Sequence, residues 1–194
     1  ALDQNGKPVA GMVNAATDYL TPIGRANLDN LKRFGDMVEV TPNVDVRKKL
    51  CRIGLFEVGD LSWPEHSVIW SAPFRIAAQM GIPLIVYGEA PQNEYGGPAG
   101  TAELERLDAP WRAEFGGFNG LRAADVIGRD GITEQDLYWY TLPTWPISEI
   151  EKTAKVEAVW LGRYLPWNGA ANAIYAGAFG FRALGHAVEG SLGD

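Results

Sequence analysis

The 194-residue chain contains one cysteine, Cys51, and two histidines. A single thiol excludes an internal disulfide and any zinc site built from several cysteines of this chain. The chain also lacks an apolar run near the ~18 residues of a membrane span, and residues 1–6 lack the pattern of a signal peptide. With 46% hydrophobic and 21% charged residues, the sequence predicts a cytoplasmic globular protein that does not engage a membrane.

Positive charge is scarce as well. The chain has 17 Lys and Arg against 24 Asp and Glu, which gives a net charge of −7. Residues 1–60 are balanced, so the deficit falls on residues 61–194. Because no basic stripe is present, we expect no binding to nucleic acid, and an anionic small substrate requires a local basic pocket.

Apolar stretches alternate with helical patterns over the first ninety residues. We expect strands at 9–15, 37–40 and 82–87, and helices at 21–34, 44–58 and 71–80. The stretch 82–87 is continuously apolar, which is typical of a strand covered on both faces of a parallel sheet. This alternation predicts an α/β fold with a doubly wound, mostly parallel sheet.

The third helix has clear local signals. Ser71 can cap it, Pro73 suits its first turn, and Gly81 follows its end. Arg75 then lies in the first turn, where the helix dipole disfavours a cation. We therefore hypothesise that Arg75 meets a ligand or a buried acid.

Three parts follow one another in the predicted organisation. Residues 1–97 form the α/β core, and residues 98–150, rich in Gly, Pro, Trp and acidic groups, form an irregular insertion or lid. Residues 151–194 return to the core with a strand at 156–161 and a helix at 170–179.

The loop after the strand 82–87 is the main candidate site, since ligands of open parallel sheets bind beyond the carboxyl ends of the strands. Glu89 and Glu94 are the candidate catalytic carboxylates, and Glu89 is also a candidate ligand of Mg²⁺. A turn with solvated acids is an equal alternative. Residues of the loop expected to bind substrate are Gly88, Tyr95, Gly96 and Gly97.

Other candidates lie near the ends of the remaining strands. Asn43 is placed to cap the helix 44–58, whose N-terminus is also a potential anion site. Arg163 and Trp167 follow the strand 156–161, where they suit a phosphate and a stacked ring, although core packing is at least as good an interpretation for Trp167. Cys51 is expected to be inert, and the basic residues near it favour a solvated face over a phosphate contact.

Several stretches also form an ordered pattern along most of the chain. They are 23–31, 41–43, 72–75, 82–89, 94–98, 114–117, 130–132, 164–167 and 189–191. The most specific part is Ile-Pro-Leu-Ile-Val-Tyr-Gly-Glu followed by Glu-Tyr-Gly-Gly-Pro. Taken together, these stretches resemble the N-acetyl sugar amidotransferases, bacterial enzymes of surface-polysaccharide and nonulosonate pathways.

The resemblance implies a PP-loop ATP pyrophosphatase fold and a defined reaction. ATP, with Mg²⁺, would adenylate the acetamido group of a nucleotide-activated N-acetyl sugar, and ammonia would displace AMP to give an acetamidino sugar. A glutaminase partner would supply the ammonia, often with a cyclase-like second subunit.

The resemblance also implies roles for individual residues. The stretch from Gly88 to Gly97 would form the floor of the site, with Glu89 or Glu94 handling the metal or a proton of ammonia. Arg25 and Arg75 would contact phosphates of a nucleotide, and Trp167 would pack on a sugar or base.

Departures from the family pattern define the alternatives. The family's Ser-Gly-Gly-Lys-Asp-Ser loop is absent, and Ala90 and Asn168 stand where Asn and Asp are common. We expect a central fragment, incomplete at both ends, that does not turn over ATP by itself. The alternatives are a non-catalytic module that binds a nucleotide-sugar or a glutaminase, and another PP-loop ATPase chemistry such as tRNA thiolation.

Overall fold

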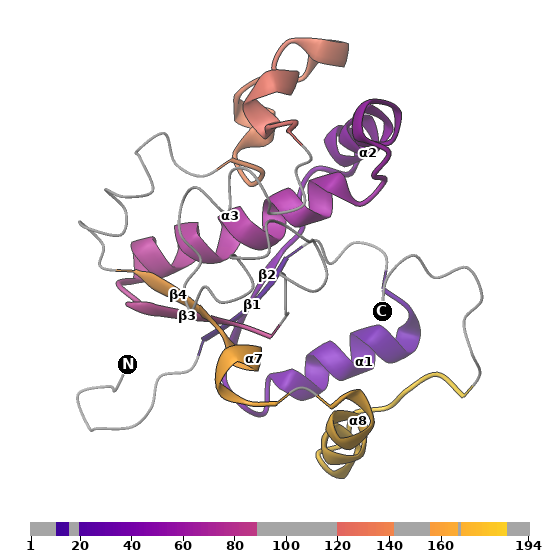
Figure 1. Cartoon of the computed structure of the whole chain (residues 1–194), viewed down its shortest axis with the longest axis vertical. Helices are drawn as coiled ribbons and strands as arrows, with labels where there is room; N and C mark the ends of the chain where they lie inside the picture. Colours follow the sequence, from indigo (N-terminus) through magenta and orange to yellow (C-terminus); the bar gives the residue numbers. More distant parts are fainter. Residues whose placement is uncertain (1–10, 16–19, 89–119, 142–155, 167, 186–194) are drawn as a thin grey trace.

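The computed structural model describes residues 11–15, 20–88, 120–141 and 156–185, with the exception of residue 167. Figure 1 shows the arrangement of its elements. The strands are β1 (Gly11–Ala15), β2 (Asp36–Val40), β3 (Leu84–Tyr87) and β4 (Glu157–Trp160). The α-helices are α1 (Pro22–Leu31), α2 (Val44–Val58), α3 (Trp63–Met80), α7 (Leu161–Tyr164) and α8 (Gly169–Ala178). No helix in the described part of the chain has both the length and the apolar character needed to cross a membrane.

The strands pair in parallel, which confirms the α/β class. β1 pairs with β2, from Gly11 opposite Asp36 to Ala15 opposite Val40, and β3 pairs with β4, from Leu84 opposite Glu157 to Tyr87 opposite Trp160. Within the described residues these are two separate pairs rather than one continuous doubly wound sheet.

The expectation that the strand 82–87 is covered on both faces is wrong. Leu84 and Val86 of β3 are 48% and 52% exposed, whereas Tyr87 is buried. Side chains alternate between the two faces of a strand, so only the face carrying Ile85 and Tyr87 packs on the core. A short run of apolar residues does not reveal whether a second layer covers it.

Helix α3 is the centre of the core. Residues along its length, from Trp63 to Ile76, belong to a cluster with α2, and interleaved with them Trp70, Phe74 and Ala77 belong to a cluster with β3 and β4. Figure 1 shows α3 extending along both strand pairs toward α2. One helix therefore fixes the position of both strand pairs.

Pro73 lies inside α3, so the predicted start of this helix at Ser71 is wrong. Proline has no N–H to donate to the carbonyl four residues earlier, which is that of Ile69. The hydroxyl of Tyr87 donates to this carbonyl oxygen at 3.2 Å and replaces the missing bond. The helix continues through proline because a residue of β3 satisfies the backbone group that proline leaves open.

Residues 120–141 pack on α2 and α3, although they lie within the predicted insertion. Trp63 donates its indole N–H to the carbonyl oxygen of Leu121 at 3.1 Å, and Val126 and Leu137 are fully buried. The segment contains the 3-10 helices η2 (Ala123–Val126), η3 (Arg129–Gly131) and η4 (Gln135–Leu137). These turns are too short to give a helical periodicity in the sequence.

Candidate functional site

The carboxyl ends of β3 and β4 lie side by side. Tyr87 pairs with Trp160 at the end of the parallel register, so Gly88 and Leu161 leave the sheet from neighbouring strands. Helix α7 starts at Leu161, directly after β4 (Figure 1). Ligands of parallel sheets bind beyond this end of the strands. We call this place, defined by Gly88 and Leu161, the β3–β4 edge.

A buried aromatic cluster holds the last residues of both strands. The ring centroids of Trp70 and Tyr87 are 4.9 Å apart, and that of Trp160 is 5.5 Å from each of them. The three side chains are buried, and pairs of this geometry contribute about 0.5–1.5 kcal/mol beyond the burial of their area. The last residues of β3 and β4 are thus held in place by packing against Trp70 of α3.

Gly88 of this edge is exposed, and among the described residues no atom apart from its chain neighbours lies within 4 Å of a Cβ built on it. The loop candidates Glu89, Glu94, Tyr95, Gly96 and Gly97 lie outside the described residues, as do Trp167 and the side chain of Arg163. Their roles stay predictions, but Gly88 and α7 mark where their segments begin.

The described residues contain no large cluster of potential metal ligands. No three or more of their His, Cys, Asp and Glu side chains are grouped so that they could share a metal ion. The expected Mg²⁺ ligand Glu89 is not among the described residues.

Asn43 caps α2. Its Oδ1 accepts hydrogen bonds from the backbone N–H groups of Asp45 at 2.9 Å and Val46 at 3.2 Å. These are two of the N–H groups that a helix start leaves without an intrahelical partner. Of the two interpretations of Asn43, the cap is the one that the structure contains.

Arg25 is paired within the protein. Its Nη1 donates to Oε2 of Glu39 on β2 at 2.7 Å, and Lys32 reaches the other oxygen of this carboxylate at 3.4 Å. The hydrogen bond from Arg25 holds the pKa of Glu39 below its ordinary value. A phosphate contact of Arg25 would therefore compete with an existing ion pair.

Arg75 lies in the interior of α3, so the prediction that it occupies a first helical turn is wrong. Its Nε and Nη2 donate to the carbonyl oxygen of Thr141 at 2.9 and 2.6 Å, and its guanidinium carbon is 4.2 Å from the ring centroid of Tyr138. Burial lowers the pKa of Arg75. These contacts tie the segment 120–141 to α3 and account for an arginine at this position.

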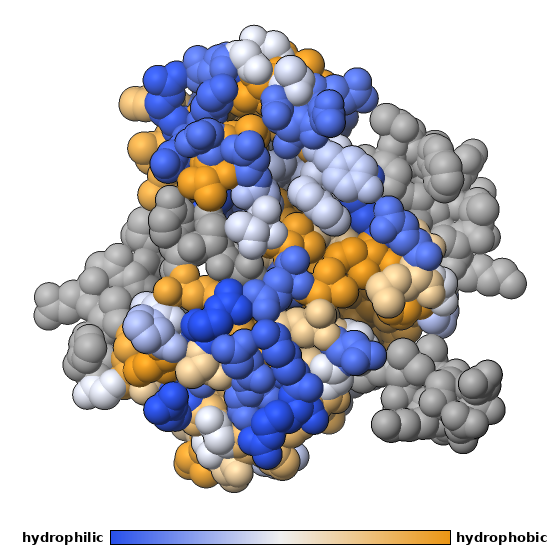
Figure 2. All heavy atoms as spheres, turned by 180° about the vertical axis from the view of Figure 1, so that it is seen from behind, coloured by the Kyte–Doolittle hydropathy of each residue, from blue (hydrophilic) through white to orange (hydrophobic). Residues whose placement is uncertain are grey.

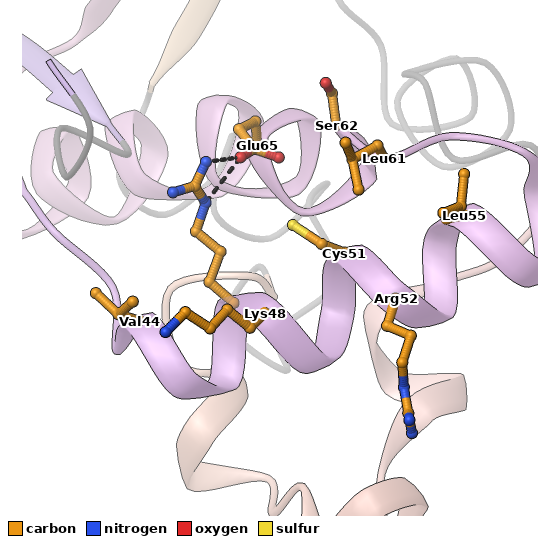
Figure 3. Close-up of a pocket in the computed structure, with 9 residues that line it drawn as sticks. Val44, Lys48, Cys51, Arg52, Leu55, Leu61, Ser62 and Glu65 are labelled. Carbon is orange, nitrogen blue, oxygen red and sulfur yellow. Dashed lines mark hydrogen bonds and ion pairs between the residues drawn. The ribbon is translucent and has the colours of Figure 1, made fainter. Parts of the chain in front are cut away.

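A groove that was not predicted from the sequence lies between α2 and the start of α3, as drawn in Figure 3. Cys51 and Arg47 of α2 face Glu65 of α3 across it, and Arg47 donates from Nε to Oε1 of Glu65 at 2.7 Å. The spacing of Val44, Cys51 and Leu55 indicates that they share one face of a helix, because residues three, four and seven apart do so. This spacing is the feature of the sequence from which one wall of the groove could have been predicted.

The two candidate places are thus the β3–β4 edge and the groove on α2. A scan against protein-family models and a search of curated proteins both find no match to this chain. The arrangement of its own residues is therefore the basis for a function.

Proposed function

We propose that this chain is the α/β body of an ATP-dependent amidotransferase that acts on a nucleotide-activated N-acetyl sugar at the β3–β4 edge. The observation that carries the proposal is the pairing of Tyr87 with Trp160. It starts the stretches 88–98 and 161–167 from one edge, and both include parts of the pattern that resembles the N-acetyl sugar amidotransferases. Gly88 and Leu161, far apart in the sequence, thereby lie together at the end of the strands beyond which ligands of parallel sheets bind.

The proposed reaction has two steps. The acetamido carbonyl oxygen attacks the α-phosphorus of ATP, a new P–O bond forms, and pyrophosphate leaves. Ammonia then adds to the activated carbon, the C–O bond breaks with AMP as the leaving group, and the ammonia nitrogen loses a proton. Activation is required because an amide oxygen is a poor leaving group, and a site closed to water protects the adenylated intermediate from hydrolysis.

The residues of the chain have distinct parts in this scheme. The exposed backbone at Gly88 allows a ligand to approach the strand end closely. Glu89 or Glu94 accepts the proton that the ammonia nitrogen loses. The ammonia comes from a glutaminase partner, with a cyclase-like subunit as a further member of the assembly.

The full-length product of the gene is the material for the test. It is incubated with ATP, ¹⁵N-labelled ammonium and a panel of UDP- and CMP-linked N-acetyl sugars, and the products are analysed by mass spectrometry. We expect ¹⁵N in the sugar and AMP as the second product. A matched panel that carries hydroxyl in place of acetamido should incorporate none.

Two variants test the assignment to the edge. Glu89→Gln should reduce incorporation by roughly 100-fold if Glu89 is the base. The control Glu134→Gln, at an exposed position in the segment 120–141, should retain activity. Sugar binding without ¹⁵N incorporation would replace the proposal by a non-catalytic binding module, and binding of RNA would favour another PP-loop chemistry.

A further inference from the structure

Tyr87 is the last residue of β3 and directly precedes Gly88 at the β3–β4 edge. Its side chain is 5% exposed, and a buried tyrosine hydroxyl usually has a hydrogen-bond partner. Here the hydroxyl donates to the carbonyl oxygen of Ile69, 18 residues earlier in α3. The strand end is therefore joined to the middle of the helix by a hydrogen bond as well as by apolar packing.

Pro73 determines which oxygen of α3 is open to this hydroxyl. In a helix interior each carbonyl oxygen accepts a hydrogen bond from the N–H four residues later, which for Ile69 is residue 73. Proline has no N–H and its ring crowds that carbonyl, so proline is strongly disfavoured at such a position. A residue placed against local preference needs a compensating contact, and the hydroxyl of Tyr87 at 3.2 Å supplies one.

Strand β3 is held to the helix from one face. Leu84 and Val86 on its outer face are exposed, whereas Ile85 and Tyr87 pack on the cluster with α3. Figure 2 shows hydrophobic residues at the surface to the right of the centre, in the part of the molecule that carries β3, β4 and the end of α3. The position of the strand end thus depends on its inward side chains, of which Tyr87 is the last.

The side chain of Tyr87 is held along its length. Its ring centroid lies 4.9 Å from that of Trp70 in α3 and 5.5 Å from that of Trp160 in β4, and its hydroxyl reaches Ile69. Apolar packing is not directional, whereas a hydrogen bond is, so the hydroxyl fixes the tip of the ring. The next residue is Gly88, and glycine has the freest backbone of all residue types. An anchor at Tyr87 therefore determines where the backbone beyond the strand begins.

We propose that Tyr87 is a positioning residue of the β3–β4 edge, and that Pro73 serves the same purpose by leaving the carbonyl oxygen of Ile69 to its hydroxyl. The hydroxyl holds the backbone at Gly88 where a ligand of the edge approaches it. The identity of that ligand, a nucleotide-activated N-acetyl sugar, rests on the proposed function, whereas the anchoring does not. A hydroxyl with a purely structural role would affect stability alone.

Variants of the ¹⁵N-labelled chain separate the two roles. Tyr87→Phe keeps the ring and removes the hydroxyl, so the oxygen of Ile69 loses a donor and the midpoint of urea unfolding should fall by roughly 0.5 M. Combining Tyr87→Phe with Pro73→Ala supplies the helical N–H at residue 73, so the midpoint should return at least to the value of the parent. The matched control Tyr140→Phe removes the hydroxyl of another buried tyrosine, which belongs to the cluster with α2.

The readout for positioning is the backbone order of Gly88, measured as the ¹⁵N order parameter of its amide with Leu84 as the internal reference. Tyr87→Phe should lower this order parameter by roughly 0.2 or more, and the double variant should keep it low although its stability is restored. Pro73→Ala alone should give an intermediate value, because the added N–H competes with the hydroxyl for the oxygen, and Tyr140→Phe should change nothing. Low order at Gly88 in the parent, an unchanged value in Tyr87→Phe, or recovery together with stability in the double variant would overturn the proposal. An unchanged value in Pro73→Ala would overturn the role of Pro73.

The full-length product of the gene shows the consequence for the reaction. Its double variant, with Tyr87→Phe and Pro73→Ala, should have a kcat for ¹⁵N incorporation at least roughly tenfold below that of the parent, because a small misplacement of the edge slows a reaction strongly. A kcat equal to that of the parent would contradict positioning. A parent that binds the sugar and incorporates no ¹⁵N would refute the proposed function instead, and the order parameter of Gly88 would still decide on the anchor.

Discussion

Replacing Gly54 by alanine should destabilise the protein, although alanine is the better helix former. Gly54 is buried in α2 where this helix crosses the start of α3. A Cβ at this position would lie 2.6 Å from the carbonyl oxygen of Asp60 and 2.8 Å from the Cβ of Trp63. These neighbours are backbone or close to it, so they cannot rotate away.

Two opposing contributions determine the size of the effect. Alanine stabilises a helix interior by about 1 kcal/mol relative to glycine. Overpacking costs about 1–3 kcal/mol, and the upper part of this range applies because the α2–α3 crossing must open. Asp60 also donates its N–H to the carbonyl oxygen of Gly54 at 3.2 Å, a bond that the opening would strain. The net prediction is a loss of about 1–2 kcal/mol in the free energy of unfolding.

Urea unfolding followed by tryptophan fluorescence measures this loss. Trp63, one of the seven tryptophans of the chain, is fully buried at the crossing and contributes to this signal. The matched control is Gly177→Ala in α8, where no atom of another described part of the chain lies within 4 Å of the added Cβ, so stability should stay the same or rise by up to about 1 kcal/mol. A Gly54→Ala variant as stable as the parent would refute the close crossing.

Three further predictions concern stability. Arg75→Met should cost about 1–3 kcal/mol in urea unfolding, because the carbonyl oxygen of Thr141 loses its donors, and Arg75→Lys should recover part of it. Asn43→Ala should cost about 1 kcal/mol through loss of the α2 cap, whereas an unchanged midpoint would contradict the cap. The backbone N–H and the hydroxyl of Thr133 hold the pKa of Asp136 below its ordinary 3.8, so its stabilising contribution is present above that pH and lost as the pH falls through the lowered value. Acid titration of Asp136→Asn should therefore show a weaker loss of stability below pH 4 than the parent, and parallel curves would contradict this.

Local signals predicted those elements whose ends are set by their own residues. Helix α2 has the bounds expected from Asn43 at its start and Gly59 at its end, where φ is 73° and glycine is favoured. Strands β3 and β4 lie within the ranges expected for them. Caps and apolar runs act over a few residues, so a sequence displays them directly.

Tertiary contacts explain where the sequence prediction was wrong. Helix α3 continues through Pro73 because the hydroxyl of Tyr87, from another element, bonds to the carbonyl of Ile69. Arg75 was predicted to lie in a first helical turn because the start of α3 was predicted at Ser71. Since α3 starts at Trp63, Arg75 lies far from the N-terminus of the helix, and its charge does not oppose the helix dipole there. Tyr87 lies 18 positions from Ile69 in the chain, so the residues around Pro73 give no sign of this hydrogen bond.

The candidate site was predicted in part. The rule for parallel strands located the edge after Tyr87, and the pairing with Trp160 was visible only in the fold. The groove on α2 could not be predicted, because it depends on the separation of two helices that Gly54 and Trp63 set. Sequence spacing identifies a helix face but not what stands opposite it.

The most direct test of the β3–β4 edge is a titration of the ¹⁵N-labelled chain with a nucleotide-activated N-acetyl sugar, followed by the backbone amide resonances. The amides of Gly88 and Leu161 should shift strongly. Those of Leu84 and Glu157, about 13 Å away at the amino ends of the same strands, should shift little. Larger shifts at the amino ends, or no shifts at saturating sugar, would contradict the assignment of this edge as the site.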